Sequence, residues 1–108
     1  MIDIIWDMET GDPDDVLNLC LLSTHPRVNL RAVTINPGSD EQVGIARHIL
    51  SLVGKSQVPI GARAPGYEKT CVSKWYYNWL GQVRPAKPDG EGCDIMYETL
   101  TNRLHSTR

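Results

Sequence analysis

The stretch from Ile2 to Leu22 limits the fold more than any other part of this chain. It begins with an apolar run from Ile2 to Trp6, broken by one aspartate, and it ends with an almost wholly apolar segment from Val16 to Leu22. A buried strand that leads directly into a helix is the opening unit of an α/β domain, and ligands of such domains bind outside the carboxyl ends of the strands. Five carboxylates lie at that position here: Asp7, Glu9, Asp12, Asp14 and Asp15. The sequence therefore predicts a functional site between the strand and the helix.

Two interpretations of this acidic turn stay open on the residues alone. Crowded carboxylates repel one another, and a hard divalent cation with oxygen ligands, Ca²⁺ or Mg²⁺, relieves that repulsion. Alternatively, Asp12 is the N-cap of the helix, Pro13 its first residue, and the acidic residues that follow complement the helix dipole. The second interpretation leaves Asp7 and Glu9 unexplained, because both precede the helix.

Composition excludes several classes of function. The 108 residues are enough for one domain with a modest core. A net charge of −2, without any cluster of lysine and arginine, argues against binding to nucleic acid. No apolar run is long enough to span a membrane, and no basic region precedes an apolar one at the N-terminus, so we expect a cytoplasmic protein. Three widely spaced cysteines indicate neither a disulfide framework nor a zinc site.

The first sixty or so residues predict alternating strands and helices. Pro26 ends the first helix near Thr24. A second strand follows over residues 28–35, and then Ser39 and Gln42 form the capping box of a second helix, which Gly54 ends. Residues 58–60 make a short third strand. Right-handed crossovers place these strands parallel in one sheet, so we predict a Rossmann-like β-α-β-α-β core over residues 1–61 of a single α/β domain.

Residues 62–108 have a different character. The segment 72–80 is aromatic and predicted to be helical, and we expect some of its rings to pack on the core while others, around Trp75 and Trp79, cover a partner or a planar ligand. Residues 82–92 are rich in proline and glycine and predict a flexible excursion. A last helix over about 94–104 places Met96, Leu100 and Leu104 on one stripe, and no fourth strand is expected after it.

The run from Ile4 to Asp15, IIWDMETGDPDD, resembles the opening motif of the inosine/uridine-preferring nucleoside hydrolases, in which an apolar strand ends in Asp-x-Asp-Pro-Gly-x-Asp-Asp. The resemblance extends through Gly61. It implies hydrolysis of the N-glycosidic bond of ribonucleosides by a Ca²⁺-bound water, with the Ca²⁺ touching the ribose hydroxyls. The family's enzymes are longer and take their remaining site residues from later segments. The resemblance therefore implies that this chain corresponds to the N-terminal part of such an enzyme, truncated and with an incomplete site.

The resemblance also implies a role for each acidic residue. Glu9 falls where the family has an aspartate that binds Ca²⁺ and activates the water, and Asp15 corresponds to a chelating Ca²⁺ ligand. Asp14 corresponds to the carboxylate that binds ribose hydroxyls, and Asp7 to a supporting residue. In this chain Glu replaces that Asp, and one extra residue separates it from the Asp-Asp pair, so Asp12 competes for one of these roles.

Further expectations concern the second turn, other functions and the sheet edge. Ser39 falls near a substrate-binding asparagine of the family. The run from Asp7 to Thr10 faintly resembles the Asp-x-Asp-x-Thr signature of haloacid-dehalogenase-type phosphatases, which would make Asp7 a nucleophile beside Mg²⁺. A non-catalytic interaction module that uses the aromatic segment is the third alternative. A three-stranded sheet also leaves one edge open, through which copies of the chain could associate.

Overall fold

The computed structural model describes residues 1–62 and 72–106, and side chains as far as residue 102. Its elements follow in the order β1 (Ile2–Met8), α1 (Asp14–Thr24), β2 (Val28–Ile35), α2 (Asp40–Leu52), β3 (Ile60–Ala62), α3 (Trp75–Leu80), β4 (Gly90–Glu91) and α4 (Gly92–Ser106). The domain is α/β with a parallel sheet, in agreement with a Rossmann-like beginning. None of the helices in the described ranges combines the length and apolar character that crossing a membrane requires.

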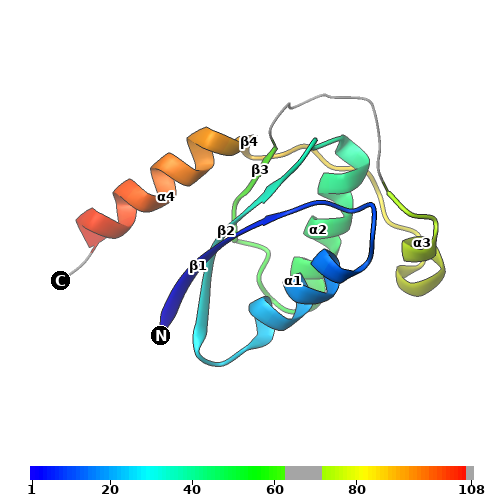
Figure 1. Cartoon of the computed structure of the whole chain (residues 1–108), viewed down its shortest axis with the longest axis horizontal. Helices are drawn as coiled ribbons and strands as arrows, with labels where there is room; N and C mark the ends of the chain where they lie inside the picture. The colour runs from blue at the N-terminus through cyan, green and yellow to red at the C-terminus, as the bar shows by residue number, and fades with distance from the viewer. Residues whose placement is uncertain (63–71, 107–108) are drawn as a thin grey trace.

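The sheet has four strands in the order β1-β2-β3-β4, and every neighbouring pair is parallel. Ile4 lies opposite Leu30 and Ile5 opposite Ala32, so Arg31 is the extra residue of a bulge in β2 while β1 keeps a regular alternation. Helices α1 and α2 cover one face of the sheet, and α4 lies on the other (Figure 1). Covering both faces in this way is what a parallel sheet needs, because its strands are apolar on both sides.

The core lies between the sheet and the pair α1 and α2. Helix α2 contributes most to it, since its spacing of apolar residues places one continuous face on the strands. The largest of the side chains that are fully removed from water come from different elements: Leu19 of α1, Ile35 of β2, Leu50 of α2, Ile60 of β3 and Tyr76 of α3. Burying side chains of this size stabilises the fold by roughly 1.5–3 kcal/mol each before the entropic cost of ordering them.

Several predicted bounds agree with the structure. Strand β2 covers residues 28–35 as expected, and α1 ends at Thr24. The capping box at the start of α2 is present, with Gln42 N–H donating to Ser39 Oγ at 3.2 Å and Ser39 N–H donating to Gln42 Oε1 at 2.9 Å. The third strand occurs slightly later than predicted, at Ile60–Ala62.

The prediction of three strands and a flexible excursion was wrong. Part of that excursion pairs with β3 as the short strand β4, with Ala62 opposite Glu91. Asp89 anchors the approach to β4, because its Oδ2 accepts a hydrogen bond from Ile60 N–H at 2.7 Å and its own N–H donates to Ile60 O at 2.7 Å. These bonds join residues far apart in the chain, and local composition carries no signal for them.

The predicted apolar stripe of the last helix also needs correction. Among the side chains described in α4, Ile95 and Thr99 are buried, while Leu100 is 56% exposed. The reason is the close approach of the helix to β3 at a glycine. A Cβ on Gly61 would lie 2.9 Å from Gly92 Cα and 3.0 Å from Ile95 Cβ, so only glycine lets α4 pack here with Ile95 against the sheet. Leu104 lies outside the described side chains.

Candidate functional site

The acidic turn connects the carboxyl end of β1 to the start of α1. Two buried side chains hold its backbone against the domain: Met8 is 2% exposed and Thr10 is 0% exposed. Helix α1 begins at Asp14, with Pro13 at the N-cap and no side-chain cap hydrogen bond. The prediction of Asp12 as the N-cap was therefore wrong. The carboxylate of Asp12 is not used to end the helix, and it is exposed.

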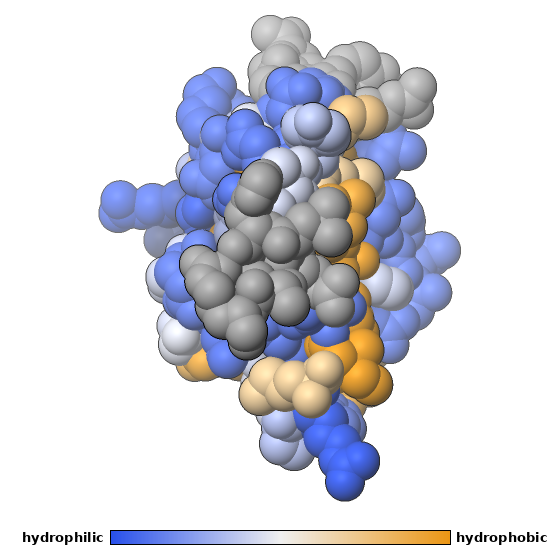
Figure 2. All heavy atoms as spheres, turned by 90° about the vertical axis from the view of Figure 1, so that its left-hand side faces the viewer, coloured by the Kyte–Doolittle hydropathy of each residue, from blue (hydrophilic) through white to orange (hydrophobic). Residues whose placement is uncertain are grey.

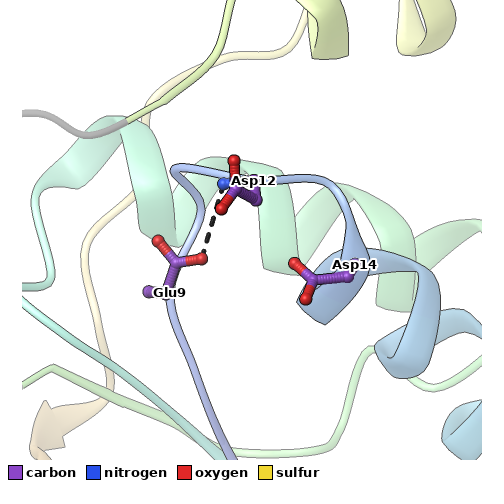
Figure 3. Close-up of side chains that lie close together, drawn as sticks. All are labelled: Glu9, Asp12 and Asp14. Atoms are coloured by element: carbon purple, nitrogen blue, oxygen red, sulfur yellow. Dashed lines mark hydrogen bonds between the residues drawn. The ribbon is translucent and has the colours of Figure 1, made fainter.

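Three carboxylates converge above this turn. Glu9, Asp12 and Asp14 each offer one oxygen, and these oxygens all lie within 4.8 Å of one another. Figure 3 shows the arrangement: Glu9 rises from the end of β1, Asp12 lies across the turn from it, and Asp14 projects from the first turn of α1. Glu9 is half-buried, whereas the two aspartates are exposed. This is a set of oxygen donors that opens toward solvent and that could hold a metal ion.

Backbone amides hold the Glu9 carboxylate in place. Its Oε2 accepts a hydrogen bond from Gly11 N–H at 2.7 Å, and its Oε1 accepts a longer one from Asp12 N–H at 3.4 Å, drawn dashed in Figure 3. The carboxylate therefore folds back over its own turn.

Asp15 lies beneath the three converging carboxylates and is not one of them. Its Oδ2 accepts a hydrogen bond from Glu9 N–H at 3.1 Å, and its main-chain oxygen accepts one from Trp6 Nε1 at 3.2 Å. Asp15 thus joins the end of β1 to the start of α1 and sets the direction in which Glu9 leaves the strand. The family resemblance implied Asp15 as a ligand, with Asp12 as a competitor for one of the roles. The structure places the Asp12 carboxylate beside that of Glu9, whereas the Asp15 carboxylate accepts from the Glu9 amide.

Asp7 lies on the face of β1 that is opposite α1, and its side chain lines a cavity separate from the acidic turn. Its Oδ1 accepts a hydrogen bond from Thr34 Oγ1 at 2.6 Å. The cavity, of about 280 Å³, lies between the carboxyl ends of β1 and β2 and the start of α4; its lining is Asp7, Thr34, Ile35, Asn36, Glu91, Gly92, Cys93 and Met96. A cavity therefore lies at the carboxyl end of the strands, where the acidic turn also begins.

Ser39 lies in the second turn of the same edge and is only 3% exposed. Its hydroxyl accepts from Gln42 N–H within the capping box, as described above. The structure therefore places Ser39 in a structural role at the start of α2, and its expected role as a substrate contact stays a prediction.

Tyr76 is a residue of this region that the sequence interpretation did not single out. It is fully buried, and its hydroxyl donates to the main-chain oxygen of Asp12 at 2.7 Å, although 64 residues separate the two. Burial, and then the negative charges of Glu9, Asp14, Asp15 and Asp12, raise the pKa of Tyr76 to about 12. Only its place in an aromatic segment could have drawn attention to it.

Helix α3 also exposes two tryptophans beside this region. Trp75 and Trp79 are 43% and 45% exposed, and their rings stack on each other with centroids 5.2 Å apart. The hydroxyl of Tyr77, by contrast, donates a hydrogen bond to the carboxylate of Glu41 in α2. Some aromatic residues therefore pack against the domain while others face outward, as the sequence predicted, and the turn-facing side of α3 is the buried side.

No protein-family model and no curated protein matches this chain.

Proposed function

We propose that this domain binds Ca²⁺ at the acidic turn and hydrolyses the N-glycosidic bond of ribonucleosides. The observation that carries the proposal is the convergence of Glu9, Asp12 and Asp14 at the carboxyl end of β1. The likeness of the segment 4–15 to the nucleoside-hydrolase motif supplies the substrate class, and the position of the turn agrees with where ligands bind in parallel α/β sheets.

The donor set fits a hard cation. Three carboxylates supply at least three of the six to eight oxygen ligands that Ca²⁺ takes, and water or substrate hydroxyls complete such shells. Mg²⁺ demands a tighter and nearly ideal octahedron of ligands, so an all-protein set of three carboxylates suits it less well. The exposure of Asp12 and Asp14 leaves room for substrate oxygens on the solvent side. When bound, Ca²⁺ lowers the pKa of a water molecule and orients it.

The residues of the chain supply the other requirements of the reaction. Carboxylates accept hydrogen bonds from vicinal hydroxyls, so Asp14 is placed to hold the ribose diol at the mouth of the turn. Breaking an N-glycosidic bond develops positive charge on the sugar, and nearby carboxylates stabilise that charge. Glu9 is the group best placed to take a proton from an attacking water, because amides fix its position and one side of it faces the other carboxylates.

A specific observation favours phosphate-ester hydrolysis as a second candidate. Asp7 lines the 280 Å³ cavity together with Thr34 and the first turn of α4, as a nucleophile beside a phosphate site would. Two facts weaken it. Glu91 lines the same cavity with a negative charge, and its Oε2 already accepts a hydrogen bond from Cys93 N–H at 3.2 Å, which occupies the start of the helix. Phosphate would need Mg²⁺ to enter there.

Two substrates separate these functions. Turnover of p-nitrophenyl riboside that depends on Ca²⁺ supports the first, while turnover of p-nitrophenyl phosphate that depends on Mg²⁺ supports the second. Glu9→Gln should abolish riboside turnover and weaken Ca²⁺ binding by titration calorimetry. Glu98→Gln, an exposed change on α4, is the matched control and should leave both unchanged.

The ligand assignment has its own test. Asp12→Asn should weaken Ca²⁺ binding more than Asp15→Asn does, because Asp12 belongs to the converging set and Asp15 bonds to the backbone below it. The reverse order would overturn the assignment to Asp12 and place the ion where the family resemblance puts it. No heat of Ca²⁺ binding and no riboside turnover would overturn the proposed function itself.

A further inference from the structure

Strand β1 forms one edge of the sheet and is very unlike the strand at the other edge. β1 has seven residues, whereas β4 has two. Natural proteins blunt exposed edges with short strands, lysine, proline or bulges. β1 has none of these features: its sequence is IDIIWDM, and the bulge of this pair lies in β2. A long, regular edge strand whose charged residues are only Asp3 and Asp7 is a surface suited to pairing with another strand.

The backbone of β1 shows which groups are directed outward. Ile2 N–H donates to Arg27 O at 2.8 Å, and Met8 O accepts from Asn36 N–H at 3.0 Å, both on the β2 side. In a parallel pair, alternate residues turn both backbone groups to the same neighbour. Even-numbered residues of β1 therefore face β2, and the N–H and C=O of Ile5 point away from it. In the described part of the chain, no strand lies on that side.

The side chains of β1 leave apolar surface at the same edge. On the α1 side of the strand, Ile2 is 61% exposed. Ile4 and Trp6 are half-buried, and both of these pack partly on the core. Figure 2, which looks onto the side of the molecule that carries α4 and the N-terminus, shows hydrophobic atoms as a stripe between hydrophilic surfaces. The apolar groups and the outward backbone groups thus belong to one edge.

We propose that β1 pairs antiparallel with β1 of a second copy of this chain about a two-fold axis at Ile4, which joins two sheets of four strands into one of eight. In this register Ile4 lies opposite Ile4 of the second copy, and Ile2 lies opposite its Trp6. The exposed Ile2 is covered, and the three apolar residues of the α1 side meet their counterparts across the axis.

Charge selects this register among the two-fold alternatives. An axis at Asp3 brings the two copies of that residue together, and an axis at Ile5 pairs Asp3 with Asp7 twice. An axis at Trp6 carries Asp3 toward Glu9 of the other copy. Like charges directly opposite one another are destabilising. Asp3 already lies 3.9 Å from Arg31 of its own chain, which lessens this repulsion, but only the axis at Ile4 places both aspartates of the strand opposite an uncharged side chain.

The pairing is compatible with the rest of the molecule. The net charge of −2 per chain gives little long-range repulsion between copies. The paired segment spans residues 1–7, and the acidic turn begins beyond it at Glu9. The inference is therefore independent of the proposed catalytic function, and either can fail without the other.

Sedimentation of matched variants tests the interface. We expect the unaltered chain to be a dimer at submillimolar concentration, and Ile2→Lys to raise the dimer dissociation constant roughly tenfold or more, since the charge enters the interface twice. Leu52→Lys is the control, because Leu52 is 65% exposed at the end of α2 and the same change lies far from β1. A monomeric unaltered chain, or equal effects of the two variants, would overturn the proposal.

A cross-link tests the register. Because Ile4 faces β2 with its backbone, the pair across the axis is of the non-hydrogen-bonded kind, in which opposite Cβ atoms lie about 4.5–5.5 Å apart and small movement permits a disulfide. In a chain with Cys20→Ala, Cys71→Ser and Cys93→Ser, Ile4→Cys should form a covalent dimer under mild oxidation. Ile2→Cys should not, because it faces Trp6 of the second copy. A covalent dimer from Ile2→Cys alone would overturn the register.

Discussion

Two consecutive turns at the same edge of the sheet, one after β1 and one after β2, are built in opposite ways. The turn before α2 is closed: Ser39 and Gln42 satisfy each other's backbone groups, and both side chains are buried. The turn before α1 has no side-chain cap, and it presents exposed carboxylates to solvent. Helix α3 contacts both regions, since Tyr76 donates to the main-chain oxygen of Asp12 in the first turn and Tyr77 donates to Glu41 in the first residues of α2.

This contrast indicates which turns of such a fold can carry a functional site. A turn whose capping box pairs its buried backbone N–H groups with side-chain oxygens contributes stability, because those donors keep hydrogen bonds when they leave water. A turn that gathers exposed carboxylates loses stability through their repulsion, and in our proposal this arrangement serves to bind a cation. Four experiments test whether the two turns differ in this way.

The largest expected effect lies in the closed turn, at Gly38. This residue has φ +98°, and an added Cβ would lie 2.5 Å from Ala62 Cβ. Gly38→Ala should lower the free energy of unfolding by about 2–5 kcal/mol, through backbone strain and overpacking together. Gly54→Ala is the control, because φ is +74° there and nothing lies within 4 Å of the added Cβ. It should cost about 1–2 kcal/mol in urea titrations; equal losses would show that packing against β3 does not matter.

The next effect concerns Tyr76, which joins the open turn to α3. Its pKa, raised from 10.0 to about 12, means that the folded state keeps the phenol proton which the unfolded state loses. Stability is therefore complete below pH 10 and falls as the pH rises toward 12, by roughly 2–3 kcal/mol. Thermal melts across this range should show the fall. Tyr76→Phe should lessen it, while Tyr97→Phe, a change at a residue that is 72% exposed, should not.

A smaller loss is expected for the capping box. Ser39→Ala removes the acceptor of Gln42 N–H and should cost about 1–2 kcal/mol. Asp12→Ala at the corresponding region of the first turn should show no loss of this kind, because Asp12 caps nothing. Urea denaturation of the two variants in parallel measures the difference. A similar loss in both would mean that the turns are not built differently.

The smallest effect is expected to change sign with Ca²⁺. In the absence of the ion, Asp12→Asn should raise the free energy of unfolding by a few tenths of a kcal/mol, since it removes like-charge repulsion among exposed groups. The gain should fade in high salt. With Ca²⁺ present, the unaltered protein should become the more stable one, because a ligand that binds the folded state stabilises it. An unchanged order of stability with and without Ca²⁺ would contradict a metal site at this turn.

The sequence by itself determined the alternation of strands and helices up to Gly61, the end of α1 at Thr24 and the capping box of α2. These features rest on neighbours in the chain: β-branched runs, a proline that excludes helical geometry before it, and a serine three residues ahead of a glutamine. The acidic turn was recognised for the same reason.

Only the tertiary structure decided which carboxylates converge, which residues of α4 are buried, and that residues 90–91 join the sheet. The carboxylate of Asp12, rather than that of Asp15, lies beside the Glu9 carboxylate, because α1 begins at Asp14 and the Asp15 carboxylate turns toward the Glu9 amide. Ile95 is buried because Gly61 admits the helix, and Tyr76 reaches Asp12 across 64 residues. Such contacts join segments that have no local signal for each other, and the packing of the whole domain sets them.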